Sequence, residues 1–384
     1  MKILLVSEYF PKSEDCEVRG GAEARCFFIA KELAKRHSVT VLTSWENGTP
    51  RESSFAGIRV LRCGKQRSYS QTGSFLARIS FALEAIRIGK KMKAEIVDAQ
   101  NFISYLPAYS IARSIGAKAV ATYHDVWVGR WISNVGLVDG VLGEFWERLT
   151  LSKHWDHFIA NSNFTKTNLI RAGIPPSKIS VVHNGVDLSL HSKVRTRKSP
   201  SPTISCVARL VSYKRIDDLI KAIALLKKDF PNLRCEIVGA GPEEAKLKKL
   251  VSQLGLESSI DFLGTLPSYK EVLSVIKRSH ILCLPSVVEG FGIVIVDAIA
   301  CGVPYVAAAI PPILEVTENG KAGLLFNPAD HKDLARKMKS LLLNKTLYAR
   351  KVAESAALAK KYDWKTLARE VKSVYATILE RKHF

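Results

Sequence analysis

Short apolar runs rich in β-branched residues alternate with amphipathic helical patterns along this chain, and the whole alternation occurs twice. The first series starts at "KILLVS" and ends at "NFTKTNLIRAG", and the second extends from "ISCVARL" to "PYVAAA". Alternation of this kind predicts a parallel sheet with helices on both faces. A chain of 384 residues also exceeds what one hydrophobic core usually organises. The sequence therefore predicts two tandem α/β domains of Rossmann-like type.

The predicted domain boundaries follow from where the alternation stops. The segment "SLHSKVRTRKSPSPT" is polar, basic and proline-containing, which is typical of a linker. We therefore expect an N-terminal domain over 1–190, a linker over 189–203 and a C-terminal domain over 203–363. Residues 364–384 predict a final amphipathic helix that packs either on the second domain or back on the first. Because ligands of open parallel sheets sit beyond the carboxyl ends of the strands, we expect the domains to face a cleft.

Composition narrows the class of partner. The formal net charge of +21 favours a polyanion, which leaves nucleic acid, an anionic membrane surface or a phosphorylated ligand. No nucleic-acid-binding motif is visible, so we expect no nucleic acid partner. The seven cysteines are scattered without metal-ligand spacing, which predicts reduced thiols and no metal site. We expect a cytoplasmic protein, because no apolar run approaches the roughly 20 residues that span a bilayer and the N-terminal run is too short for a signal peptide.

Residues 75–93, "FLARISFALEAIRIGKKMK", combine an apolar helical face with five cations. Two interpretations stay open. The helix either faces the core with a solvated basic side, or lies on an anionic membrane as a peripheral attachment.

The stretch "CLPSVVEGFGIVIVDAIACGVP" predicts a buried strand, a turn and a helix. Glu289 then lies at the carboxyl end of the strand. The amides of Gly292 and Ile293 lie near the helix start, where unsatisfied N–H groups favour an anion such as phosphate. Asp297 is one turn further on, from where it can reach the ribose hydroxyls of a ligand whose phosphate sits at that terminus. The alternative is that Glu289 caps the helix and Asp297 is half-exposed.

Three other loops carry candidate site residues. In "VARLVSYKRIDDLI", Arg209 and Lys214 follow a strand and suit a diphosphate, unless they are merely solvated. Gly20 and Gly21 open the first helix and allow close approach of a ligand, or form a flexible turn. They do not form a GxGxxG fingerprint. His124 in "ATYHD" ends a strand and is either a hydroxyl-binding or proton-shuttling group or a structural histidine.

Eight motifs in this order resemble retaining glycosyltransferases of family four, which have the glycosyltransferase B (GT-B) architecture. The motifs are the Gly20-Gly21 pair, "TYHD", "ANSNFTK", "VVHNGVD", "ARLVSYK", "VGAGP", "CLPSVVEGFGIVIVDAIACGVP" and "GLLFNPAD". The resemblance covers nearly the whole chain. It implies transfer of a sugar from a nucleotide diphosphate donor to a hydroxyl of a glycan, lipid-linked or small-molecule acceptor, with retention of anomeric configuration. It further implies polysaccharide or glycolipid biosynthesis and no requirement for a metal or other cofactor.

The resemblance also assigns roles to these residues. It implies that Arg209 and Lys214 hold the diphosphate and that Gly21 approaches it from the first domain. His124 would contact the donor sugar and Glu289 would lie against the sugar hydroxyls. Asp297 takes the place of a second glutamate that binds ribose in the family.

The chain departs from the family pattern at two points. Asp297 is one methylene shorter than glutamate, and Pro311-Pro312 replaces a Gly-Gly pair of many members, which removes amide donors. Whether these departures alter the choice of donor is not predicted by the sequence. Two other classes stay open: a nucleotide-sugar epimerase or phosphorylase, and a non-catalytic nucleotide-sugar-binding protein. No carboxylate pair is placed as a double-displacement couple, which favours same-face attack by the acceptor. The sequence does not predict the base, the sugar, the acceptor or the oligomeric state.

Overall fold

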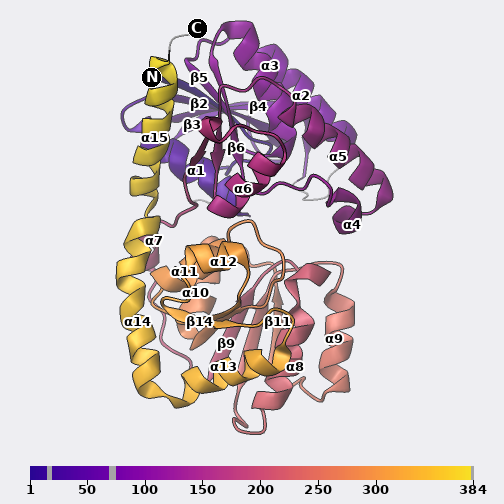
Figure 1. The fold of residues 1–384 in the computed structure, drawn as a ribbon, viewed down its shortest axis with the longest axis vertical. Coiled ribbons are helices and arrows are strands. Elements are labelled where there is room, and N and C mark those ends of the chain that lie inside the picture. Colours follow the sequence, from indigo (N-terminus) through magenta and orange to yellow (C-terminus); the bar gives the residue numbers. More distant parts are fainter. Residues whose placement is uncertain (15–19, 69–74, 382–384) are drawn as a thin grey trace. The chain divides into compact units, whose positions relative to one another are not determined.

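The structure is a computed structural model that describes residues 1–14, 20–68 and 75–381 (Figure 1). The chain divides into two compact units. Unit 1 consists of Met1–Asn184 with Trp364–Phe384, and unit 2 is Gly185–Asp363. Each unit is built around a largely parallel sheet, which confirms the predicted pair of Rossmann-like domains.

The sheet of unit 1 has the strand order β3-β4-β2-β1-β5-β6-β7-β8 within the described residues. Its strands are β1 (Lys2–Val6), β2 (Ser38–Glu46), β3 (Glu52–Phe55), β4 (Ile58–Arg67), β5 (Ile96–Ala99), β6 (Lys118–Tyr123), β7 (His157–Ala160) and β8 (Ile179–Val181). Neighbouring strands are parallel except for the hairpin of β3 and β4. Strand β1 lies between β2 and β5, so the strand order reverses there, where ligands of such sheets bind.

Helices cover both faces of this sheet. On one face lie α1 (Gly21–Ala34) and α15 (Trp364–Glu380), and the other face carries α2 (Phe75–Gly89), α3 (Tyr105–Ile115) and α5 (Leu137–Leu151). The remaining elements of unit 1 are α4 (Trp131–Val135), α6 (Asn163–Arg171), and the 3-10 turns Phe102–Ser104 and Pro176–Lys178. On α2, Phe81 and Ala85 are fully buried in the core. The core-facing interpretation of residues 75–93 is therefore the one that the structure shows.

The C-terminal helix α15 belongs to unit 1, so it crosses back to the first domain. Its Trp364 stacks on Phe28 of α1 with ring centroids 5.8 Å apart. Tyr375 is fully buried, and its hydroxyl donates to Asp98 Oδ2 at 2.5 Å. Burial raises the pKa of Asp98 to about 7, although the hydrogen bond from Tyr375 acts in the opposite direction. A buried polar contact thus joins α15 to strand β5.

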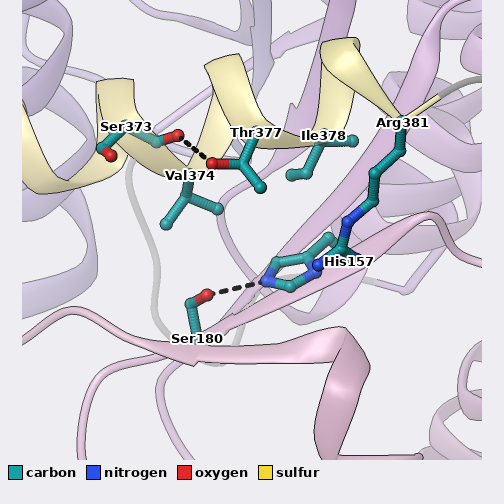
Figure 2. Close-up of a pocket in the computed structure, with 7 residues that line it drawn as sticks. All are labelled: His157, Ser180, Ser373, Val374, Thr377, Ile378 and Arg381. Carbon is teal, nitrogen blue, oxygen red and sulfur yellow. Dashed lines mark hydrogen bonds between the residues drawn. The ribbon is translucent and has the colours of Figure 1, made fainter.

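A small polar pocket of about 240 Å³ lies between α15 and strands β7 and β8 (Figure 2). Inside it, His157 Nε2 lies 2.8 Å from the Ser180 hydroxyl. The other lining residues are Ser373, Val374, Thr377, Ile378 and Arg381. None of the sequence-predicted site residues lines this pocket.

The sheet of unit 2 is parallel and has the order β11-β10-β9-β12-β13-β14. Its strands are β9 (Thr203–Val207), β10 (Arg234–Val238), β11 (Ile260–Gly264), β12 (Ile281–Leu284), β13 (Tyr305–Ala308) and β14 (Gly323–Phe326). Its helices are α7 (Leu188–Lys193), α8 (Ile216–Leu226), α9 (Glu244–Gln253), α10 (Tyr269–Arg278), α11 (Ile293–Ala300), α12 (Pro311–Val316), α13 (His331–Leu343) and α14 (Lys345–Ala359), with 3-10 turns at Ser212–Lys214 and Lys360–Tyr362. Strand β9 is flanked by β10 and β12, which is again a reversal of strand order.

The segment that the sequence predicts as a linker is attached to unit 2. Asp187 caps helix α7 by accepting from the amides of Ser189 and Leu190. Lys277 Nζ donates to two backbone carbonyls of the segment, His191 O at 2.6 Å and Val194 O at 2.7 Å. The basic, proline-containing composition is typical of a solvated linker, but the lysine of α10 satisfies these carbonyls. The chain passes between the units at 184–185 and 363–364 instead.

Candidate active site

His124 follows strand β6 at the carboxyl edge of the unit 1 sheet. Its Nε2 lies 3.0 Å from the carbonyl oxygen of Gln100. Because a carbonyl only accepts, Nε2 carries the hydrogen of the neutral ring and Nδ1 is left as an acceptor. Burial, and then the positive charge of Arg25, lower the pKa of His124 to about 3. His124 can therefore accept a hydrogen bond from a hydroxyl near neutral pH, but it is not an acid there.

The motif "ANSNFTK" supports the loop that carries His124. The Asn161 side-chain amide donates to His124 O at 2.9 Å, and Thr165 Oγ1 donates to Asn161 Oδ1 at 2.8 Å. Ser162 caps helix α6 by accepting from the amide of Thr165. These polar groups are buried, so the motif fixes the backbone of the histidine loop.

Gly20 and Gly21 open helix α1, and Gly20 has an extended backbone with φ of −174°. Any residue adopts that conformation. No described atom lies within 4 Å of the position that a Cβ at Gly20 would take. Neither backbone angle nor packing against the described residues requires glycine at position 20, so close approach of a ligand stays a prediction.

Arg209, Lys214 and Glu289 come together at the carboxyl edge of the unit 2 sheet. Lys214 Nζ lies 2.5 Å from Glu289 Oε1, and the two side chains are only 13% and 12% exposed. Arg209 is exposed, and its Nη2 donates to the Tyr213 hydroxyl at 2.7 Å. The loop after β12 is joined to the turn that carries Lys214, because the Val287 amide donates to Tyr213 O at 3.0 Å. The structure thus pairs two residues, Lys214 and Glu289, that are 75 positions apart in the sequence.

Tyr213 was not predicted from the sequence, although it contacts both cations. Besides its bond to Arg209, its ring lies 5.7 Å from Lys214 Nζ. Its position inside "VSYKR" between the two predicted cations is the only signal that the sequence offers.

The glycines of "VGAGP" hold the Arg209 loop in place. A Cβ at Gly239 would lie 2.0 Å from Ala208 O, and a Cβ at Gly241 would lie 2.3 Å from Leu210 O. The Leu210 amide donates to Ala240 O at 3.0 Å. Only glycine permits this close approach of the two loops. This motif, to which the sequence analysis assigns no role, therefore supports Arg209.

The N-terminus of helix α11 lies directly after the Glu289 loop. Gly292 caps the helix with φ of +83°, a backbone conformation that favours glycine, and a Cβ there would also displace the Ile313 Cδ1 methyl, which lies 2.5 Å from its position. Ile293 is the first helical residue. Helix α12 begins at Pro311, and proline is well tolerated in a first turn because its amide would lack a helical partner.

Asp297 is 4% exposed, so it is not half-exposed as one of the two interpretations predicted. Its Oδ1 accepts from the Tyr269 hydroxyl and lies 3.2 Å from His191 Nε2. His191 is itself 1% exposed, and its Nδ1 lies 2.8 Å from Asp187 O. Sequence reasoning missed both partners because they lie on other elements, α10 and α7.

Among the described residues, no three His, Cys, Asp or Glu side chains gather in an arrangement that could hold a metal ion.

Fold and site together define a two-domain α/β protein of the GT-B class, with a cation–carboxylate cluster beside a helix N-terminus in its second domain. The family profile described as "Glycosyltransferase Family 4" matches residues 19–190, and the one described as "Glycosyl transferases group 1" matches residues 190–358. The chain is therefore a group 1 glycosyltransferase of family four.

Individual relatives are similar over nearly the whole chain. A phosphatidylinositol N-acetylglucosaminyltransferase subunit of Arabidopsis thaliana is 26% identical, with 99% of this chain and 83% of the relative covered. A glycogen synthase of Mycobacterium tuberculosis is 27% identical, with 98% and 94% covered. The crystal structure of Anabaena HepE in complex with UDP has a TM-score of 0.74 at 20% identity, with 98% of this chain and 100% of that chain covered.

Proposed function

We propose that this protein transfers a sugar from a nucleotide diphosphate donor to a hydroxyl acceptor, with retention of anomeric configuration and without a metal. The observation that carries the proposal is the cluster of Arg209, Lys214 and Glu289 beside the N-terminus of α11. Family membership and the UDP bound by the Anabaena neighbour support a nucleotide-sugar donor.

The residues of unit 2 suit the chemistry of the leaving group. Cleavage of the sugar–phosphate bond places positive charge on the anomeric carbon and negative charge on the diphosphate. Arg209, Lys214 and the free amides at the start of α11 stabilise that negative charge. Since Lys214 is already bonded to Glu289, the lysine is held in place before the donor arrives. Glu289 in turn can accept hydrogen bonds from sugar hydroxyls.

The proposed displacement uses groups of the substrates themselves. The acceptor oxygen forms a bond to the anomeric carbon on the face from which the diphosphate oxygen departs, so the configuration is retained. The leaving phosphate oxygen takes the proton of the acceptor hydroxyl. His124 is a poor base for that proton near neutral pH, because burial and the charge of Arg25 lower its pKa to about 3.

The names of two relatives support two classes of acceptor. The phosphatidylinositol N-acetylglucosaminyltransferase subunit supports a lipid acceptor, and the glycogen synthase supports a glycan acceptor. We propose a carbohydrate or lipid-linked acceptor and a cytoplasmic location with peripheral attachment to a membrane. No described helix has both the length and the apolar character needed to cross a bilayer.

The proposal is tested by incubating the protein with uridine, guanosine and adenosine diphosphate sugars and a panel of glycan and lipid acceptors. We expect one donor to give a nucleoside diphosphate and an α- or β-glycoside with the donor's own anomeric configuration, unchanged by a chelator. An inverted product would refute retention. A dependence on inorganic phosphate would indicate a phosphorylase, and conversion of the donor without an acceptor would indicate an epimerase. Binding without turnover would leave only a non-catalytic binding protein.

A further inference from the structure

Helices α4 and α5 carry an exposed apolar stripe. The described residues include eleven exposed large hydrophobic side chains, and six of these lie on the two helices. They are Ile132, Leu137, Val138, Val141, Leu142 and Phe145, with exposed fractions between 44% and 74%. Single exposed apolar residues are normal on a protein surface, but a group of six on two adjoining helices indicates an interaction site.

The stripe lies on a hairpin whose other side is tightly packed. Leu137, Val141 and Phe145 follow one another at intervals of four, so they share one face of α5. On the side facing α4, a Cβ at Gly140 would lie 2.6 Å from Ile132 Cα, and a Cβ at Gly143 would lie 2.4 Å from the Trp131 ring. The two helices are therefore in close contact, and the stripe is a separate, outward face.

A buried carboxylate fixes this hairpin to the loop that follows His124. Glu147 of α5 accepts from the Trp131 indole at 2.7 Å and from the Trp127 amide at 3.2 Å. The Trp127 indole in turn donates to Asp125 Oδ2 at 2.8 Å. The exposed stripe and the candidate sugar-binding histidine thus belong to one connected piece of structure.

The charge of the protein selects the partner of the stripe. Two copies that each carry a net charge of +21 repel one another, whereas an anionic bilayer attracts the protein. Helices α4 and α5 are themselves slightly acidic: Glu144 pairs with Arg148 at 2.6 Å and Glu147 is buried, which leaves Asp139 as the exposed charge. The attraction comes from the net charge of the chain as a whole, to which Arg130, exposed directly before α4, contributes next to the stripe.

We propose that the stripe on α4 and α5 enters the interfacial region of an anionic phospholipid bilayer. The inference rests on the proposed function, because it would place the loop of His124 near acceptors that are linked to lipid. The sequence offered α2 as a candidate membrane-binding helix, but its apolar face is buried. We therefore assign membrane binding to α4 and α5 instead. A helix that exposes apolar residues on one side and is anchored on the other lies on a membrane rather than across it.

The test uses the full-length protein and vesicles of phosphatidylcholine, with and without phosphatidylglycerol. In the triple variant Leu137→Gln, Val141→Gln, Phe145→Gln, we expect partitioning onto anionic vesicles to fall at least about tenfold, since each large side chain loses its apolar transfer energy. Val138→Glu is an independent single variant that should also weaken binding. The matched control is Leu343→Gln, which changes a side chain that is 61% exposed in unit 2. It should bind as wild type does.

Thermal stabilisation by a donor nucleotide measures folding and donor binding independently of vesicle binding. The wild type, the triple variant, Val138→Glu and Leu343→Gln should all show it. A wild-type protein that ignores anionic vesicles, or a triple variant that binds them as well as wild type, would overturn the proposal. A wild-type dimer that the triple variant dissociates would do so too, because the stripe would then be an interface between copies. Vesicle binding that depends on the stripe would support the surface even if no sugar were transferred, so the two proposals fail separately.

Discussion

Replacing Tyr269 by phenylalanine isolates the contact that buries the carboxylate of Asp297. The hydroxyl donates to Oδ1 of a side chain that is 4% exposed, so little water is available to take its place. A hydrogen bond to a charged group contributes about 1.5–3 kcal/mol. Its loss should therefore increase local opening of α10 and α11 by about ten- to 150-fold.

Hydrogen exchange followed by mass spectrometry measures this opening on peptides from α10 and α11. The matched control is Tyr348→Phe, because the Tyr348 hydroxyl donates to a neutral group, His280 O, at 3.0 Å. A neutral hydrogen bond contributes only about 0.5–1.5 kcal/mol, so the control should have the smaller local effect. A Tyr269→Phe protein that exchanges no faster than the Tyr348→Phe protein at its own site would refute the buried, charge-assisted contact.

The contacts of Asp297 also allow a prediction of how strongly the donor nucleotide binds. If Asp297 accepts hydrogen bonds from ribose, Asp297→Asn should weaken nucleotide binding about ten- to hundredfold in calorimetry, because the charge is lost. Asp297→Glu adds a methylene beside Tyr269 and His191, which should cost about 1–3 kcal/mol of stability through overpacking. Unchanged affinity in Asp297→Asn would mean that the carboxylate serves only the protein's own hydrogen bonds.

Arg209→Ala and Lys214→Ala should each weaken nucleotide diphosphate binding and nearly abolish transfer, and wild-type turnover in either would remove that residue from the mechanism. The pH profile of kcat should show no step from His124 between pH 5 and 8, because its pKa is lowered to about 3, and a step near pH 6.5 that His124→Gln removes would contradict this assignment. The pKa of Asp98 is raised to about 7, so its contribution to stability should be complete below about pH 4 and be lost as the pH rises through 7. All six tryptophans lie in unit 1, so unfolding monitored by tryptophan fluorescence measures the stability of the unit that contains Asp98. Asp98→Asn should make this stability depend less on pH between pH 4 and 7.

The fold followed from the sequence because strand–helix alternation is a local pattern that parallel sheets require. That topology also explains why His124, Arg209 and Glu289 were found at strand ends, since parallel strands bring their carboxyl ends to one edge. The position of the basic segment after Asp187 could not be predicted in this way. Its composition is typical of a linker, whereas Lys277, more than 80 residues away, supplies the hydrogen bonds that attach it to unit 2.

The side chains that surround the site residues could not be predicted either, because they are also distant in the sequence. Asp297 is buried by Tyr269, 28 positions away, and by His191, 106 positions away. Helical periodicity predicted that Asp297 lies one turn beyond the start of α11, but not which side chains cover it. Likewise, nothing in the sequence of α5 distinguished its exposed apolar residues from core positions, because the stripe has the spacing of an ordinary amphipathic helix.

Thermal unfolding with a panel of nucleotide diphosphate sugars, followed by product analysis, tests the central claim most directly. A ligand at a hundred times its dissociation constant adds about 2.7 kcal/mol of stability. We expect one nucleotide class to stabilise the wild-type protein, to lose most of this effect in Lys214→Ala, and to be the donor from which a new glycoside is formed. If no nucleotide sugar stabilises the protein, or if stabilisation is the same in Lys214→Ala, then Lys214 and Glu289 do not form a donor site.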